Sequence, residues 1–203
     1  MPENRGTYHL TNNPDIYEPA RNNNFEFLIT NVDNLLRAGV DSATASDSDY
    51  IKNGQEALRV AVESSSVPHF ALGVIEVKRG NNIAKYAGLP TFNATSLTLK
   101  DYISVNSGYS NPKDVMLAWQ ALAYNVRSEK ISRASVYKRT CTLTEYSPDY
   151  EVVRQWTLEG CWCSEVSEDP FSTESEGQRK FTATIVFDRA YPIVSEEVNP
   201  ANA

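Results

Sequence analysis

Residues 85–126, KYAGLPTFNATSLTLKDYISVNSGYSNPKDVMLAWQALAYNV, decide the fold of this chain. The first part of this stretch predicts a turn, because Gly88 and Pro90 both interrupt regular structure. Leu97 and Leu99 then alternate with polar residues, which is typical of a strand that buries one face. A polar loop follows, and after it comes the only convincing helix in the sequence.

The helix is predicted from its start signal and from its apolar spacing. Asn111 is a favoured N-cap residue, and Pro112 suits the first helical position. Asp114 places an acid near the positive end of the helix dipole. Four apolar residues follow at intervals of four, three and four, and therefore share one face: Val115, Trp119, Leu122 and Val126.

Most of the other ordered segments predict strands, at 25–30, 58–63, 74–79, 140–146, 152–162 and 181–187. The turn sequences at 80–82 and 148–149 predict hairpins. The acidic segment 164–177 is typical of a solvated loop. Several strands joined by short turns, with one helix, favour a mainly β fold: an antiparallel β-barrel or sandwich with one packed α-helix.

Some predicted strands carry apolar residues on both faces. Ile75 and Val77 follow Val74, and Val152 stands beside Val153, so neighbouring positions that point in opposite directions are both apolar. Such a strand needs cover on both sides. One small domain with one helix has little to supply that cover, so a subunit interface is expected.

Composition indicates one soluble domain. The chain has 203 residues, of which 41% are apolar and 22% charged, with a net charge of −7. No apolar run approaches the ~20 residues that span a bilayer, and no secretory signal is evident, so we expect no membrane insertion. Three cysteines predict reduced thiols rather than a disulfide framework. The acidic balance argues against sequence-reading nucleic-acid binding.

Two catalytic or metal-binding patterns are present only in part. The S-x-x-K pattern of penicillin-recognising enzymes occurs at 110–113 and 135–138, but its partner motifs S-D-N and K-T-G are missing. Asp47 and Asp49 resemble the start of a calcium loop, but Lys52 stands where glycine is required. Neither pattern predicts a site.

The remaining ligand-type residues also predict no site. His9 and His69 lie far apart, without metal-ligand spacing to any cysteine. Cys161 and Cys163 share one face of a predicted strand, which indicates packing. We therefore expect no catalytic, cofactor-binding or metal residues, no cofactor, and no enzymatic activity.

A series of short segments resembles the tail tube proteins of contractile-tailed bacteriophages, a family shared with the inner tubes of contractile injection systems. Their order along the chain makes the resemblance specific, although each segment is short. The segments are 12–15, 20–25, 79–81, 85–88, 90–92, 97–102, 118–124, 154–162 and 181–190.

Polar composition predicts an extended N-terminal arm at 1–24, a loop at 40–57 and a C-terminal tail at 192–203, and the resemblance implies a tube domain at 25–191. It implies hexameric rings that stack into a hollow tube inside a contractile sheath, contacting baseplate and tape-measure proteins. DNA would pass through the lumen without sequence-specific binding. The expected location is the virion tail, after synthesis in the host cytoplasm.

Two alternatives remain open at this stage. The first is the inner tube of a phage-derived contractile injection particle without a genome. The second belongs to a different class, a monomeric β-sandwich that binds glycans through Trp156, Trp162 or Tyr109.

Overall fold

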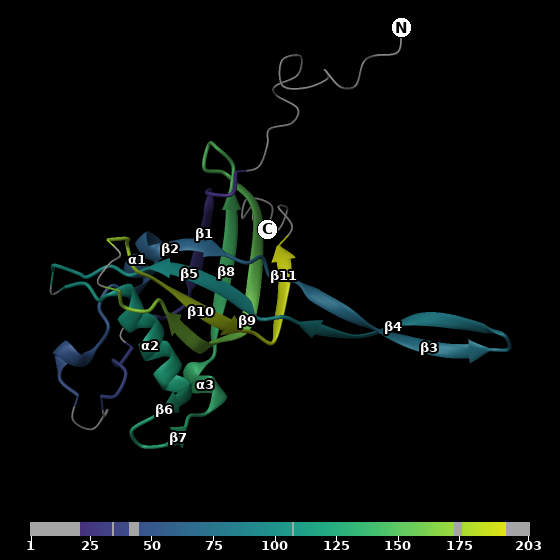
Figure 1. The fold of residues 1–203 in the computed structure, drawn as a ribbon, viewed down its shortest axis with the longest axis horizontal. Coiled ribbons are helices and arrows are strands. Elements are labelled where there is room, and N and C mark those ends of the chain that lie inside the picture. Colours follow the sequence, from purple (N-terminus) through teal and green to yellow (C-terminus); the bar gives the residue numbers. More distant parts are fainter. Residues whose placement is uncertain (1–20, 34, 41–44, 107, 173–175, 194–203) are drawn as a thin grey trace, which may run out of the picture.

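The structure, a computed structural model, describes residues 21–33, 35–40, 45–106, 108–172 and 176–193. Strands dominate this part of the chain (Figure 1). The strands are β1 (Phe25–Ile29), β2 (Val62–Ser65), β3 (Phe70–Arg79), β4 (Asn82–Phe92), β5 (Thr95–Lys100), β6 (Tyr124–Asn125), β7 (Lys130–Ile131), β8 (Arg139–Tyr146), β9 (Val152–Glu168), β10 (Lys180–Val186) and β11 (Arg189–Ile193). The helices are the 3-10 turn η1 (Asp47–Asp49), α1 (Gly54–Ala61), α2 (Pro112–Ala123) and α3 (Ala134–Tyr137).

The long strand β9 organises the body of the molecule. Its first half, as far as Cys161, pairs with β8 and β11, and its second half, from Trp162, pairs with β10. All these pairings are antiparallel, and the sheet order is β1-β8-β9-β10-β5-β2. Gly160, with a φ of +69°, lies where β9 changes partners and where its register with β8 shifts. A bulge with a left-handed glycine bends the strand there, so both halves curve around one core.

The core lies between this curved sheet and the helices. Strands β5 and β10 alternate buried and less buried residues, as one-faced strands do. Helix α2 packs on β9, and α1 packs on α2 and β1. Among the described residues, the largest fully buried side chain is that of Trp119 in α2, whose indole N–H donates to the Tyr137 carbonyl at 2.9 Å. No helix in the described residues is long and apolar enough to cross a bilayer.

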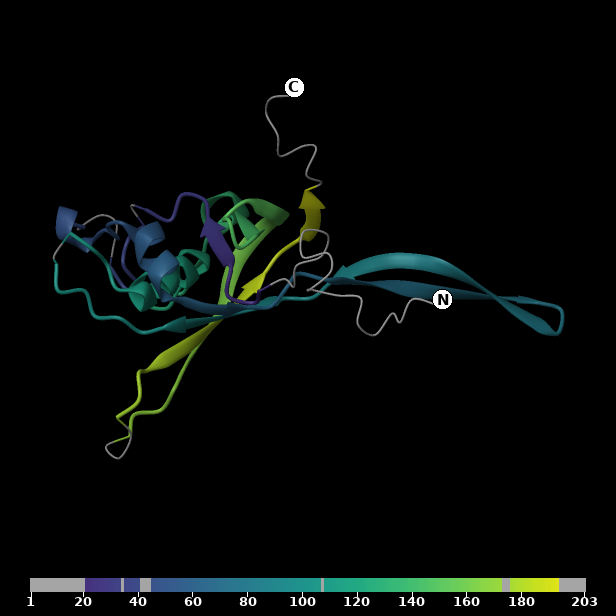
Figure 2. The same cartoon turned by 90° about the horizontal axis from the view of Figure 1, so that it is seen from above.

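The hairpin of β3 and β4 projects from the body along the longest axis of the molecule, as Figures 1 and 2 both show. Its base is anchored to the core through aromatic rings. The Phe70 and Phe92 rings lie 5.6 Å apart, and Phe92 packs 6.2 Å from the buried Phe187. Helices α1 and α2 lie at the opposite end of that axis (Figure 1).

Much of the predicted architecture is confirmed. The structure is mainly β with antiparallel sheets, and strands occupy the positions predicted at 25–30, 140–146, 152–162 and 181–187. The predicted turn at 80–82 joins β3 to β4, and Gly80 has a φ of +62°. The predicted helix begins at Pro112, and Val115 and Trp119 are fully buried.

The strand predicted at 58–63 is wrong over most of its length, because α1 occupies Gly54–Ala61. Leu58 and Ala61 are buried and lie three residues apart, which suits a helix, whereas Val60 is 61% exposed. The Asp33 carboxylate accepts from the Gly54 N–H at 2.5 Å, which satisfies a free donor at the helix start. The chain therefore has α1 and α3 besides the single helix expected.

The turn predicted around Gly88 and Pro90 is also wrong, because β4 runs through both residues. Gly88 lies close to Gly73 of β3, where a bulge shifts the register. Pro90 is tolerated because β4 pairs only with β3 among the described strands, so one edge of β4 needs no backbone donor.

Three further segment boundaries differ from expectation. Helix α2 ends at Ala123, so Val126 lies beyond it and is 80% exposed. Strand β9 extends to Glu168, into the segment predicted as a solvated loop. Strand β11 ends at Ile193, so it includes two residues of the segment expected to be a tail. Residues 1–20 of the expected arm lie outside the described residues.

Candidate assembly surface

The projecting hairpin is built by strong local signals. Gly80 and Asn81 form its two-residue turn, and the Ile83 N–H donates to the Asn82 side chain at 2.8 Å. The cross-strand pair Glu76 and Lys85 forms an ion pair of 3.3 Å. These contacts fix the register of the two strands, so the positions of their side chains are set before any partner arrives.

Both faces of this hairpin are apolar and open to solvent. Val74 and Ile75 point to opposite faces and are 64% and 54% exposed. All ten residues of β3 are exposed. We call the large exposed apolar residues of the two strands the hairpin surface: Phe70, Leu72, Val74, Ile75, Val77, Ile83, Tyr86 and Leu89.

The rest of the described chain leaves the hairpin surface uncovered. Between residues 71–91 and the other described residues there is no hydrogen bond or ion pair. An isolated two-stranded hairpin is marginally stable in water, and a large exposed apolar patch usually marks an interaction site. Full burial of each large apolar side chain contributes about 1.5–3 kcal/mol. The hairpin surface is therefore the candidate contact surface of the described chain.

The sequence-based expectation of strands with two apolar faces is confirmed at both places. Val74, Ile75 and Val77 are exposed in β3. Val152 and Val153, at the start of β9, are 41% and 47% exposed. The sequence did not indicate the length of the hairpin, because Gly88 and Pro90 suggested an earlier end.

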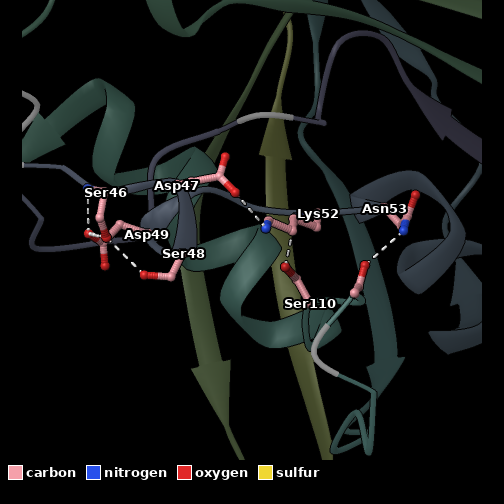
Figure 3. Close-up of polar contacts among 8 residues, drawn as sticks. Ser46, Asp47, Ser48, Asp49, Lys52, Asn53 and Ser110 are labelled. Atoms are coloured by element: carbon pink, nitrogen blue, oxygen red, sulfur yellow. Dashed lines mark hydrogen bonds and ion pairs between the residues drawn. The ribbon is translucent and has the colours of Figure 1, made fainter.

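A second exposed region lies around the loop between β5 and α2. Hydrogen bonds tie this loop to the segment 46–53 (Figure 3). The Lys52 N–H donates to the Ser110 hydroxyl at 2.9 Å, and the Asn53 side chain donates to the Gly108 carbonyl at 2.8 Å. Beside the loop is a cleft of about 310 Å³, lined in part by Val60 and Tyr102.

The same contacts account for the partial catalytic and calcium patterns. Ser110 is 3% exposed, and its hydroxyl already accepts from Lys52. Asp47 pairs with the Lys52 ammonium at 3.0 Å, while the Asp49 carboxylate accepts from the Ser46 hydroxyl at 2.6 Å (Figure 3). The hydrogen bond from Ser46 is the main reason why the pKa of Asp49 is lowered. These groups are occupied by structural contacts.

The three cysteines are buried and reduced. Burial raises the pKa of the Cys163 thiol to about 12 and raises that of Cys141 well above its ordinary value. Such thiols are poor nucleophiles and metal ligands at neutral pH. Within the described ranges, no three His, Cys, Asp or Glu side chains gather where they could hold one metal ion.

The aromatic residues of the glycan-binding alternative are not brought together as a platform. Trp156 is half-buried and packs against the core. Trp162 is half-buried and meets the Tyr137 ring edge-on at 5.9 Å. Tyr109 is 46% exposed and lines the cleft beside α1. Neither Trp156 nor Trp162 lines that cleft.

No protein-family model matches the sequence, and no curated protein matches it. Solved structures share the fold across most of the chain. The tube-terminating cap of the anti-feeding prophage has a TM-score of 0.57 at 14% identity, over 88% of this chain and 93% of that one.

Two further structures come from the extracellular contractile injection system PVC, each matching 88% of this chain. A chain of its sheath–tube complex in the extended state has a TM-score of 0.54 at 15% identity, over 94% of that chain. Its sheath/tube terminator has a TM-score of 0.54 at 16% identity, over 99% of that chain. The chain thus has the fold found in tube and tube-terminating proteins of contractile injection systems.

Proposed function

We propose that this chain is a structural subunit of the tube of a contractile injection system, and that it acts through self-assembly rather than catalysis. The observation that carries the proposal is the hairpin surface, which is apolar on both faces and is left uncovered by the other described residues. Burial against identical copies would remove that surface from water. The shared fold supports this reading, because the similar structures include tube and terminator proteins.

The assembly we propose is a hexameric ring, with rings stacked into a hollow tube inside a sheath and docked on a baseplate. A head-to-tail contact closes into a ring when its rotation allows, and a contact that does not close builds a filament. The similar structures include a chain of a sheath–tube complex and a chain of a six-fold symmetrised baseplate, the latter with a TM-score of 0.51 and 12% identity.

The cargo we infer is the DNA of a bacteriophage, which would follow a tape-measure protein through the tube of a virion tail. The acidic chain, with a net charge of −7, supports passage without retention, because a basic wall would bind phosphates. The genome-free injection particle remains the second candidate, favoured by the fold shared with the anti-feeding prophage and PVC proteins.

Electron microscopy of the purified protein tests the proposal. At increasing concentration we expect rings of six subunits, and then tubes of stacked rings. Rings that never stack would favour a tube-terminating cap over the repeating subunit. A dispersed monomer at every concentration would overturn the assembly proposal.

The variant V74E/I75E adds two charges to the hairpin surface, and its effect on assembly tests that surface. The matched control adds two charges to exposed apolar positions outside the hairpin. V126E/I131E changes two side chains that are 80% and 81% exposed and lie away from β3 and β4. It should assemble like the wild type, whereas V74E/I75E should not. Equal loss in both variants would mean that added charge alone prevents assembly.

A further inference from the structure

Asn53 and Gly54 form the only Asn-Gly pair in the sequence, and such a pair is chemically labile. The backbone nitrogen of the glycine attacks the side-chain amide carbon of the asparagine. A new C–N bond closes a five-membered succinimide, and the side-chain nitrogen leaves as ammonia with the proton of the glycine nitrogen. The succinimide then adds water to give aspartate or isoaspartate. Asn53 is exposed, so water can reach it.

The fold requires both residues of this pair. Asn53 has a φ of +52°, in the left-handed region where asparagine is enriched among residues that carry a side chain. Gly54 is buried, and a β-carbon there would lie 2.9 Å from the Ile51 side chain and 3.4 Å from the Val32 carbonyl oxygen. Replacing either residue would therefore strain the backbone or overpack the site.

Asp33 holds the nitrogen that would attack. Its carboxylate accepts from the Gly54 N–H at 2.5 Å and from the Gln55 N–H at 3.3 Å. Ring closure requires the Gly54 nitrogen to give up its proton. A carboxylate hydrogen-bonded to that N–H opposes the loss of the proton, because it would then face a second negative charge.

The group that would be attacked is held as well. The Asn53 side-chain nitrogen donates to the Gly108 carbonyl at 2.8 Å, as Figure 3 shows. This nitrogen is the one that leaves as ammonia, so the hydrogen bond cannot survive the reaction. Each of the two reacting groups therefore has a contact in the folded chain that must break before the pair can react.

We propose that Asn53–Gly54 is a deamidation site that Asp33 protects in the folded chain. The inference goes beyond the proposed function and holds for the single folded chain. In the product a carboxylate replaces the amide donor, so the hydrogen bond to Gly108 is lost. Isoaspartate also adds one atom to the backbone directly before α1, which displaces the Gly54 N–H from Asp33. Deamidation thus loosens both the start of α1 and the loop between β5 and α2.

Peptide mapping by mass spectrometry, after incubation in mildly alkaline buffer, tests the proposal. D33A removes the acceptor of the Gly54 N–H, and the matched control E56Q removes an exposed carboxylate from the first turn of α1. Folded D33A should deamidate at Asn53 roughly tenfold faster than the wild type, which is the factor expected for the loss of one charge-assisted hydrogen bond. E56Q should keep the wild-type rate.

The same measurement in urea separates the role of the fold from that of the local sequence. Unfolded wild type and unfolded D33A should deamidate at one common rate that exceeds the folded wild-type rate. A folded wild type that deamidates at Asn53 as fast as the unfolded chain would overturn the proposal, and so would a folded D33A no faster than E56Q. If circular dichroism shows that D33A does not fold, D33N supplies the folded comparison, and it too must exceed the wild-type rate.

Discussion

Gly160 is the residue at which the body of the molecule bends. Its φ of +69° belongs to the left-handed region, and it lies where β9 passes from β8 and β11 to β10. A β-carbon at this position would collide with the Asp188 carboxylate, which the Lys138 ammonium holds at 2.6 Å. Only glycine satisfies both the backbone conformation and the close approach.

We predict that Gly160→Ala lowers the free energy of unfolding more than Gly39→Ala does. Gly39 also has a positive φ of +84°, but a β-carbon there would meet nothing within 4 Å. Its substitution should cost about 1–2 kcal/mol for the backbone alone. Gly160→Ala should cost up to about 1 kcal/mol more, because the exposed Asp188 carboxylate must turn away and loosen its ion pair with Lys138. Urea denaturation of both variants measures the difference, and equal losses would contradict the role of Asp188.

Glu168 is the centre of a small charge network at the end of β9. Its carboxylate receives the Lys113 ammonium and the Arg179 guanidinium, each at 2.7 Å. The hydrogen bond from Lys113 is the main cause of a lowered pKa for Glu168, with Arg179 contributing further. The network joins α2 to β9. Glu168, which the sequence analysis placed in a solvated loop, therefore makes structural contacts.

The lowered pKa gives Glu168 a defined effect on stability. A carboxyl with a depressed folded pKa stabilises the fold above its ordinary pKa of 4.5, and the effect is lost as pH falls through the folded value. The urea midpoint of the wild type should therefore fall between about pH 5 and pH 3 more steeply than that of Glu168→Gln. Glu165→Gln, at an exposed site, is the control and should retain the wild-type slope; identical slopes for all three proteins would contradict the prediction.

Among the elements, α2 shows where sequence patterns succeed and where they stop. Its N-cap, proline and first two apolar residues predicted the start of the helix and its buried face. Spacing alone also placed Val126 on that face, but the backbone turns into β6 after Ala123. Spacing cannot locate the end of a helix whose termination depends on the contacts of the following segment.

Trp119→Ala should lower the free energy of unfolding by about 3–5 kcal/mol, because it leaves a cavity beside β9. It also leaves the Tyr137 carbonyl without the indole donor. Val126→Ala, at the position that spacing assigned to the same face, should change stability by less than about 0.5 kcal/mol. Chemical denaturation compares the two, and a large effect at Val126 would show that the helix continues past Ala123.

Strand predictions succeeded where one face meets the core and the other meets water, as in β5 and β10. They failed at α1, because Leu58, Val60 and Val62 alternate like a strand. The decisive contact there is the cap from Asp33, which lies 21 residues before Gly54 and leaves no local signal. Short apolar patterns are ambiguous until distant partners are known.

For the whole molecule, part of the candidate assembly surface could be predicted and part could not. The turn at 80–82 and the two-faced apolar run at 74–77 indicated a hairpin that needs a partner. The exposed apolar residues of the loop between β5 and α2 gave no such signal, because Ile103 and Val105 lie in irregular structure without periodicity. The far end of this loop is held by a long-range contact, in which the Lys52 N–H donates to the Ser110 hydroxyl at 2.9 Å.

On the proposed function, the hairpin surface of a single chain belongs to an incomplete assembly. A free subunit exposes apolar area that an assembled one would bury, so its stability and its association are linked through concentration. The net charge of −7 makes free subunits repel one another, so association should strengthen as salt screens this repulsion.

Sedimentation velocity over a concentration series tests the central claim most directly, with the wild type and V74E/I75E side by side. We predict that the wild type moves from a 22.7 kDa species to much larger assemblies as concentration rises, while the variant stays at 22.7 kDa. A wild type that remains a single 22.7 kDa species at every concentration would contradict the account.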